Sequence, residues 1–247
     1  MIKKLIALFV MSLIFCTFSF AQETSSPQMS SIPLFQAFFE SPVEIEKPYV
    51  IGDISFADYD FVSSFELGAR GGLLLSPKIQ LGSEISFISL SPDNGDGESG
   101  ISDLLVQGKY TWMLEKSRVA AGGKITLPIG SEDVGGGNTN FGMFGGIRHP
   151  LSPKATMNGV LGINFIEAGK DRETSLMLGF GGTMIINNQI SAVGEFNLQT
   201  EVEYAMLSFG VDYQLKEMGR IRSGIGIGMD DGAPDIQIKA CYLFDIK

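Results

Sequence analysis

The sequence is poor in residues on which much protein chemistry depends. Its 247 residues include two cysteines and a single histidine. Only Cys241 lies beyond the first twenty-one residues, so a mature chain that lacks them could form no internal disulfide. The histidine, His149, precedes Pro150, and no serine is distinguished beside it. A serine hydrolase needs a serine, a histidine and a third group that orients the histidine, so we expect no enzyme.

Basic side chains are also few. Lysine and arginine number 18 against 28 aspartates and glutamates, and the formal net charge is −10. Because such an acidic chain has no electrostatic footprint for nucleic acid, we expect no nucleic-acid partner. The acids of 93–98 lack the spacing of a calcium-binding loop, and those of 230–235 are interpreted as a solvated loop. The sequence therefore predicts no metal site and no cofactor.

Long apolar runs are absent after residue 21, where none approaches the 18 residues that a membrane helix requires. The chain is nevertheless apolar, with 44% hydrophobic residues, 18 phenylalanines and 31 glycines. An apolar chain without a candidate membrane helix is either a tightly packed β domain or a membrane barrel.

The N-terminus has the pattern of a signal peptide. Lys3 and Lys4 precede an apolar stretch at 5–15, and Ser19 and Ala21 supply small residues at a cleavage site. We expect cleavage near Ala21 and export to the outer membrane of a Gram-negative cell. An uncleaved anchor helix is the alternative, although the apolar run is short for one.

Beyond the leader, apolar and polar residues alternate with a period of two, which is typical of β-strands. For example, Ile79, Leu81, Ile85 and Phe87 alternate with polar or small residues. About twelve such segments occur, at 49–57, 61–75, 79–90, 101–114, 118–128, 139–150, 155–167, 174–186, 190–199, 203–215, 220–229 and 235–246. The pattern predicts an all-β fold, an antiparallel up-and-down transmembrane β-barrel of about 12 strands, over residues 49–247.

The connections between these segments are of two kinds. Tight turns centre near 77, 116, 153, 188 and 218. Connections rich in glycine and acid, most of them longer, lie at 91–100, 129–138, 168–173, 200–202 and 230–234. Outer-membrane barrels have short periplasmic turns and longer outer loops, so both termini are expected on the periplasmic side. A soluble lipocalin-like barrel or sandwich, with its apolar face inward, would alternate equally well and remains the rival fold.

The polar face of the alternation supplies the candidate site. The predicted lumen-lining residues are Glu66, Arg70, Glu84, Asp103, Lys109, Lys124, Arg148, Glu195, Asp212, Arg222 and Lys239. One interpretation is an open pore with a charged constriction. The other is an interior filled by paired charges, because small barrels are filled by side chains. The sequence leaves both open.

Residues 22–48 precede the first strand and carry several large apolar side chains. Phe35, Phe38 and Phe39 are candidates for a plug that inserts into the barrel. A periplasmic extension and a flexible leader are the alternatives.

Three stretches resemble a known family. These are FESP at 39–42, GISDL through KY at 100–110, and KITLPIGS at 124–131 followed by the glycine-rich 138–146. They resemble the outer-membrane β-barrel family of the meta-pathway of phenol degradation, whose members are regarded as transporters. The resemblance implies passage or binding of small aromatic compounds, and it implies no catalytic residues.

We therefore expect a monomeric barrel that mediates passive transport of small, hydrophobic or aromatic compounds. Its expected partners are outer-membrane lipid, lipopolysaccharide and the small-molecule cargo. The alternative is a non-conducting structural or surface-interaction barrel, whose acidic outer loops would do the binding.

Overall fold

The computed structural model describes residues 32–43, 47–168, 171–215 and 219–246, and every regular element in these ranges is a β-strand. The strands are β1 (Tyr49–Tyr59), β2 (Val62–Ser76), β3 (Ile79–Pro92), β4 (Glu98–Ile101), β5 (Leu104–Leu114), β6 (Ser117–Leu127), β7 (Asn140–Pro150), β8 (Ala155–Ala168), β9 (Asp171–Ile185), β10 (Ile190–Gln199), β11 (Tyr204–Gln214), β12 (Arg220–Gly228) and β13 (Ile236–Asp245). Within the described ranges, no helix is long and apolar enough to cross a membrane. The predicted signal peptide lies outside them.

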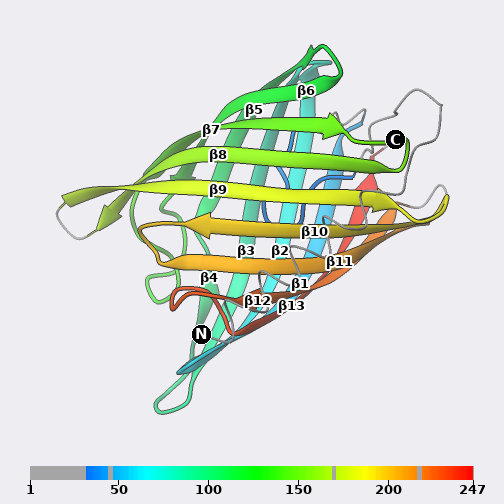
Figure 1. The fold of residues 1–247 in the computed structure, drawn as a ribbon. Helices are drawn as coiled ribbons and strands as arrows, with labels where there is room; N and C mark the ends of the chain where they lie inside the picture. The colour runs from blue at the N-terminus through cyan, green and yellow to red at the C-terminus, as the bar shows by residue number, and fades with distance from the viewer. Residues whose placement is uncertain (1–31, 44–46, 169–170, 216–218, 247) are drawn as a thin grey trace.

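The strands form one closed antiparallel barrel (Figure 1). Each strand pairs with its sequence neighbours except that β4 and β5 do not pair with each other, because both pair with β3. The barrel closes where β1 pairs with β13. The circle of β1–β3 and β5–β13 has twelve strands, and β4 is an additional strand paired with β3. The predicted fold class is therefore confirmed.

One predicted strand, 101–114, is divided in the structure. The strand β3 pairs with β5 over Ile79–Glu84 and with β4 over Phe87–Leu90, so β4 and β5 follow one another along the same neighbour. Ser102 and Asp103 lie between them. The backbone N–H of Ser102 donates to the carbonyl of Ser86 at 2.7 Å, and the N–H of Ser86 donates to Ser102 Oγ at 2.9 Å. The wall thus stays hydrogen bonded across the break.

The loop predicted at 168–173 is wrong in extent, because β8 continues to Ala168 and β9 begins at Asp171. Strand pairing through this region replaces most of the expected loop. The tight turns near 77, 116, 153 and 188 are confirmed, whereas the turn near 218 lies largely outside the described residues. The longest described connection joins β6 to β7, at the opposite end of the barrel from these turns.

The barrel carries its apolar side chains on the outside. On β1, Phe56 is 47% exposed, whereas Asp53 and Ser55 are 3% and 4% exposed. The same arrangement recurs on the other long strands, where large aliphatic and aromatic residues are exposed and polar residues are buried. A soluble lipocalin-like barrel requires the opposite arrangement, so that rival fold is excluded. Apolar side chains outside and polar ones inside suit a barrel surrounded by lipid.

Aromatic pairs on the wall lie near both ends of the barrel. Tyr110 and Trp112 have ring centroids 5.7 Å apart near the tight turns, and Phe141 and Phe165 have centroids 4.9 Å apart near the longer loops. Membrane barrels typically have a girdle of aromatic side chains at each of the two lipid–water interfaces, and these two pairs match that arrangement.

We predict that Leu161→Arg destabilises the barrel in lipid. Leu161 lies midway along β8 with its side chain 61% exposed on the outer wall. An arginine at the bilayer midplane costs about 2–4 kcal/mol, whereas a similar change on a water-exposed surface costs about 0.5 kcal/mol or less. Denaturant unfolding in phospholipid vesicles measures the difference, with Leu161→Met as the control. A free energy of unfolding unchanged by Leu161→Arg would contradict the lipid-facing assignment.

Candidate functional site

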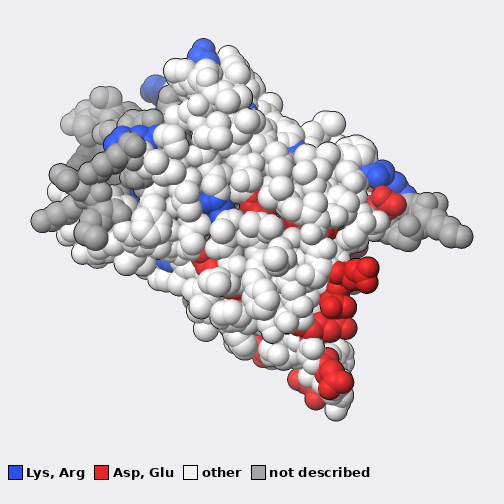
Figure 2. All heavy atoms as spheres, turned by 180° about the vertical axis from the view of Figure 1, so that it is seen from behind, with Lys and Arg blue, Asp and Glu red and all other residues white. Residues whose placement is uncertain are grey.

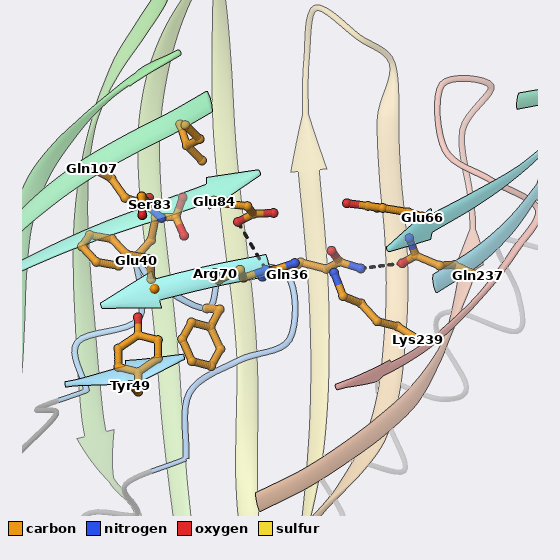
Figure 3. Close-up of a pocket in the computed structure, with 14 residues that line it drawn as sticks. Gln36, Glu40, Tyr49, Glu66, Arg70, Ser83, Glu84, Gln107, Gln237 and Lys239 are labelled. Atoms are coloured by element: carbon orange, nitrogen blue, oxygen red, sulfur yellow. Dashed lines mark hydrogen bonds and ion pairs between the residues drawn. The ribbon is translucent and has the colours of Figure 1, made fainter. Parts of the chain in front are cut away.

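Residues 32–43, here called the inner segment, lie within the barrel and pack against its inner face (Figures 1 and 3). Leu34 and Phe35 pack with Val160 of β8 and Val193 of β10. Phe38 packs with Tyr49 of β1 on another part of the wall. Contacts to strands so far apart in the sequence place the segment across the lumen.

Glycines of the wall make room for the phenylalanine rings of the inner segment. A Cβ atom on Gly210 of β11 would collide with the ring of Phe35, and one on Gly82 of β3 would collide with the ring of Phe39. The rings therefore occupy hollows that larger wall residues would fill. The three plug candidates, Phe35, Phe38 and Phe39, are all buried.

The carboxylate of Glu195 on β10 anchors the beginning of the inner segment. It accepts the consecutive backbone N–H groups of Phe35, Gln36 and Ala37, at 2.5, 3.0 and 2.9 Å. Asn197 Nδ2 donates to the same carboxylate at 2.7 Å. Glu195 is only 2% exposed. Successive backbone N–H groups that converge on one anion form a favourable site for negative charge, and hydrogen bonds to an ionised group are the stronger kind.

Two cations of the wall hold the backbone carbonyls of the inner segment. Lys109 Nζ donates to the carbonyls of Phe39 and Ser41 at 2.7 and 2.8 Å. Arg222 donates to the carbonyls of Pro33 and Leu34 at 2.7 and 3.3 Å. The guanidinium carbon of Arg222 also lies 4.4 Å from the centroid of the Phe35 ring, which adds a cation–π contact.

Polar side chains of the inner segment complete its contacts. Glu40 forms an ion pair with Lys124 of β6 at 3.3 Å. Ser41 Oγ donates to Asn158 Oδ1 at 3.1 Å, and Arg148 Nη1 donates to the same oxygen at 2.7 Å. The segment is therefore bound by charged residues on several strands.

A second charged cluster lies on the wall itself. Asp53 forms ion pairs with Arg70 at 3.2 Å and with Lys239 at 3.3 Å. Arg70 also pairs with Glu84 at 3.3 Å. The cluster joins β1, β2, β3 and β13 across the seam where the barrel closes. On the neighbouring β11 and β12, Asp212 pairs with Arg222 at 3.1 Å.

A cavity of about 230 Å³ lies between the inner segment and this part of the wall (Figure 3). Its lining includes the rings of Phe38, Phe39 and Tyr49. Polar and charged groups from four strands and the inner segment complete it: Gln36, Glu40, Glu66, Arg70, Ser83, Glu84, Gln107, Gln237 and Lys239. A second cavity of about 250 Å³ lies beside Lys124, Asn140 and Asn164.

The structure places ten of the eleven predicted lumen residues inside the barrel, in the contacts given above or on the cavity wall. Asp103 is the exception. It lies between β4 and β5, where its carboxylate accepts a hydrogen bond from the N–H of Gly130 at 3.0 Å. This bond joins the β4–β5 link to the long connection between β6 and β7. Asp53 was missed, although its place in the alternation of β1, beside outward Ile54, could have indicated it. The role of these residues in choosing cargo stays a prediction.

His149 has a serine partner that the sequence did not indicate. Ser117 of β6 and His149 of β7 are joined by a hydrogen bond of 2.8 Å between Oγ and Nδ1. The described residues show no other polar partner for the imidazole ring. A hydrolase triad also has a third group that orients the histidine, and the described residues place none at this ring.

Acidic side chains gather at one end of the barrel (Figure 2). The connections at the end away from the tight turns carry Asp93, Asp96, Glu132, Asp133, Glu201, Glu203, Asp230, Asp231 and Asp235. The tight turns at the other end carry basic residues, among them Lys78, Lys116 and Lys154. The barrel therefore has one strongly acidic mouth.

The barrel is closed, its apolar side chains face outward, and its polar lumen contains the inner segment. These features define the chain as a β-barrel of the outer-membrane type. The family model described as "Putative MetA-pathway of phenol degradation" matches residues 46–240, and the chain belongs to this family. The predicted family is thereby confirmed, and the motifs at 100–110 and 124–146 lie within the matched range, whereas the one at 39–42 precedes it. No curated protein sequence matches the chain.

Solved structures of outer-membrane channels share the fold. The COG4313 outer membrane channel from Pseudomonas putida F1 has a TM-score of 0.67 at 12% identity, covering 91% of this chain and 100% of that one. The KdgM porin in complex with disordered oligogalacturonate has a TM-score of 0.59 at 9% identity, covering 81% and 99%. The NanC porin has a TM-score of 0.56 at 10% identity, with the same coverage. At these identities the similarity is one of fold.

We predict that Asp53→Asn destabilises the barrel by about 3 kcal/mol. The substitution removes the shared partner of Arg70 and Lys239, and a buried ion pair that loses one member leaves an uncompensated charge. Denaturant unfolding in vesicles measures the change. The control is Asp58→Asn, an equal change at the exposed end of β1. Equal, small effects of both substitutions would show that the cluster contributes little.

Proposed function

We propose that the protein is a passive diffusion channel of the outer membrane, in which the inner segment is the gate. The observation that carries this proposal is the set of hydrogen bonds from three consecutive backbone N–H groups of the segment to Glu195. These bonds hold a stretch of chain across the lumen that is not part of the wall.

The construction of the wall supports a movable gate. Its strands pair with one another around the whole circle, and the inner segment contributes no strand to it. Displacement of the segment would break its bonds to Glu195, Lys109 and Arg222, but would leave the ladder of the barrel intact. Closing and opening then require only a change in a limited set of side-chain contacts.

For the cargo we propose small aromatic compounds that carry a polar group. Membership of a family named for phenol degradation supports this class. The cavity beside the inner segment is larger than the ~150 Å³ of an apolar cavity that takes up benzene, and it combines three aromatic rings with polar side chains. An aromatic ring could pack on Phe38, Phe39 and Tyr49 while its polar group is hydrogen bonded.

The proposed location follows from the exterior of the barrel. Apolar side chains would contact outer-membrane lipid, the acidic loops would face outward beside lipopolysaccharide, and the tight turns and both termini would face the periplasm. Export would use the leader, with cleavage near Ala21. We propose a monomer that acts without catalysis.

A non-conducting surface-interaction barrel is the second candidate. The occupied lumen and the acidic mouth favour it, because a permanently filled interior would leave the loops as the working surface. The two candidates differ in one measurable property, which is conductance.

We predict that Glu195→Gln opens the channel more often. The amide keeps the shape of the side chain but loses the charge that three N–H groups bind, and hydrogen bonds to charged groups are worth about 1.5–3 kcal/mol. The open probability of the refolded mature protein in a planar bilayer should rise about tenfold or more. Glu201→Gln, at an exposed loop, is the matched control.

Deletion of residues 22–43 should give a larger and steadier conductance than the full chain. The full chain, the Glu195→Gln variant and the deletion variant are each shown to be folded. If none of the three conducts, the proposed channel function is wrong and the surface-interaction barrel remains.

A further inference from the structure

The charges around the cavity between the inner segment and the barrel seam are almost all compensated by ion pairs. Asp53 binds both Arg70 and Lys239, and Glu84 binds Arg70, so these two acids and two bases sum to zero. The remaining acid from the inner segment, Glu40, is paired with Lys124. The two cations on the cavity wall thus already have carboxylate partners, which weakens their attraction for an incoming anion.

Glu66 of β2 differs from the other acids of the cavity. Its carboxylate accepts hydrogen bonds from Ser86 Oγ at 2.6 Å and from Ser55 Oγ at 3.4 Å, and both donors are neutral. No lysine or arginine of the described chain lies within ion-pair distance of it. In Figure 3 it lines the same space as Arg70 and Lys239, with no ion pair drawn to either. One negative charge of the cavity is therefore uncompensated by an ion pair.

Gln107 of β5 provides a second, independent observation. Its side chain is 7% exposed and lines the cavity, and its Oε1 atom is buried without a hydrogen-bond partner in the described structure. A buried acceptor without a donor is costly unless something fills the cavity and supplies one. Glu66 and Gln107 together favour an occupant that carries positive charge or N–H donors.

We propose that the lumen selects small monovalent cations over anions and that Glu66 sets this preference. The class includes inorganic cations such as potassium and small compounds with a primary ammonium group. This inference rests on the proposed channel function and deepens it, because it adds charge to the description of the cargo. Neutral aromatic compounds and amines would pass, and aromatic carboxylates would be disfavoured.

The acidic mouth of the barrel acts in the same direction. Acidic residues of 91–98 and 229–235 lie at the loop end of the barrel, and a mouth of one sign raises the local concentration of ions of the opposite sign. Because these exposed charges are screened at ordinary ionic strength, they contribute to the rate of entry, whereas Glu66 acts inside the lumen. High salt separates the two contributions.

The test is the reversal potential of the full mature chain, and of its Glu195→Gln variant, in a planar bilayer across a potassium chloride gradient. Even at the dielectric constant of water, one charge about 10 Å from a passing ion changes the concentration of each sign about twofold. The ratio of potassium to chloride permeability should therefore be about four at low salt and should stay above one at high salt, where Glu66→Gln should bring it close to one.

Two variants complete the comparison. Glu66→Asp retains the charge and should retain the selectivity. Glu115→Gln makes the same change of charge in an exposed tight turn outside the cavity and should leave the ratio unchanged. Folding of each variant is checked on a gel, where an unheated, folded barrel migrates differently from the same protein after heat denaturation.

Each outcome decides a separate point. If the unaltered protein conducts with a potassium-to-chloride permeability ratio of one or less, the proposed cation preference is wrong. This outcome does not depend on the folding of any Glu66 variant. A ratio that is unaffected by Glu66→Gln removes Glu66 as its source. Absence of any conductance, in contrast, overturns the proposed channel and with it the cation preference.

Discussion

The structure depends on one constraint, the pairing of every backbone N–H and C=O within the wall. Lipid offers no hydrogen-bond partners, so strands can cross it only when the sheet closes on itself. Pairing of β1 with β13 supplies this closure, and the serine bonds at the β4–β5 break keep it continuous. Once the sheet is closed, the period of two along each strand assigns apolar side chains to the outside and polar side chains to the lumen.

A polar lumen of this size creates a second requirement, because charges removed from water need partners. The seam cluster around Asp53 meets this requirement within the wall. Glu195, Lys109 and Arg222 meet it through the inner segment, whose N–H groups and carbonyls they bind. The segment is therefore both an occupant of the lumen and a source of partners for otherwise buried charges. Because of this dual role, we expect that weakening the hydrogen bonds to Glu195 alone shifts the position of the inner segment.

Much of the barrel could be predicted from the sequence, because alternation is a local property. It identified the strands, the twelve-stranded circle and the inward position of residues such as Lys109 and Arg222. The division of β4 from β5 could not be predicted, since it involves the hydrogen bond that the N–H of Gly130, in a distant loop, donates to the Asp103 carboxylate. The same limit applies to the partners of Glu195 and to the Ser117–His149 pair. Alternation assigns the face of a residue, whereas its partner depends on the register between strands.

The central claim is that the inner segment closes the lumen, and a reversible crosslink tests it most directly. A Cβ atom on Gly179 of β9 would lie 3.5 Å from the Cβ of Ala37, a separation compatible with a disulfide. The measurement is the single-channel conductance of Ala37→Cys with Gly179→Cys, in a Cys241→Ser background, before and after reduction. The account predicts a closed channel when oxidised and openings when reduced. Equal conductance in the two states, with the disulfide demonstrated, would contradict it.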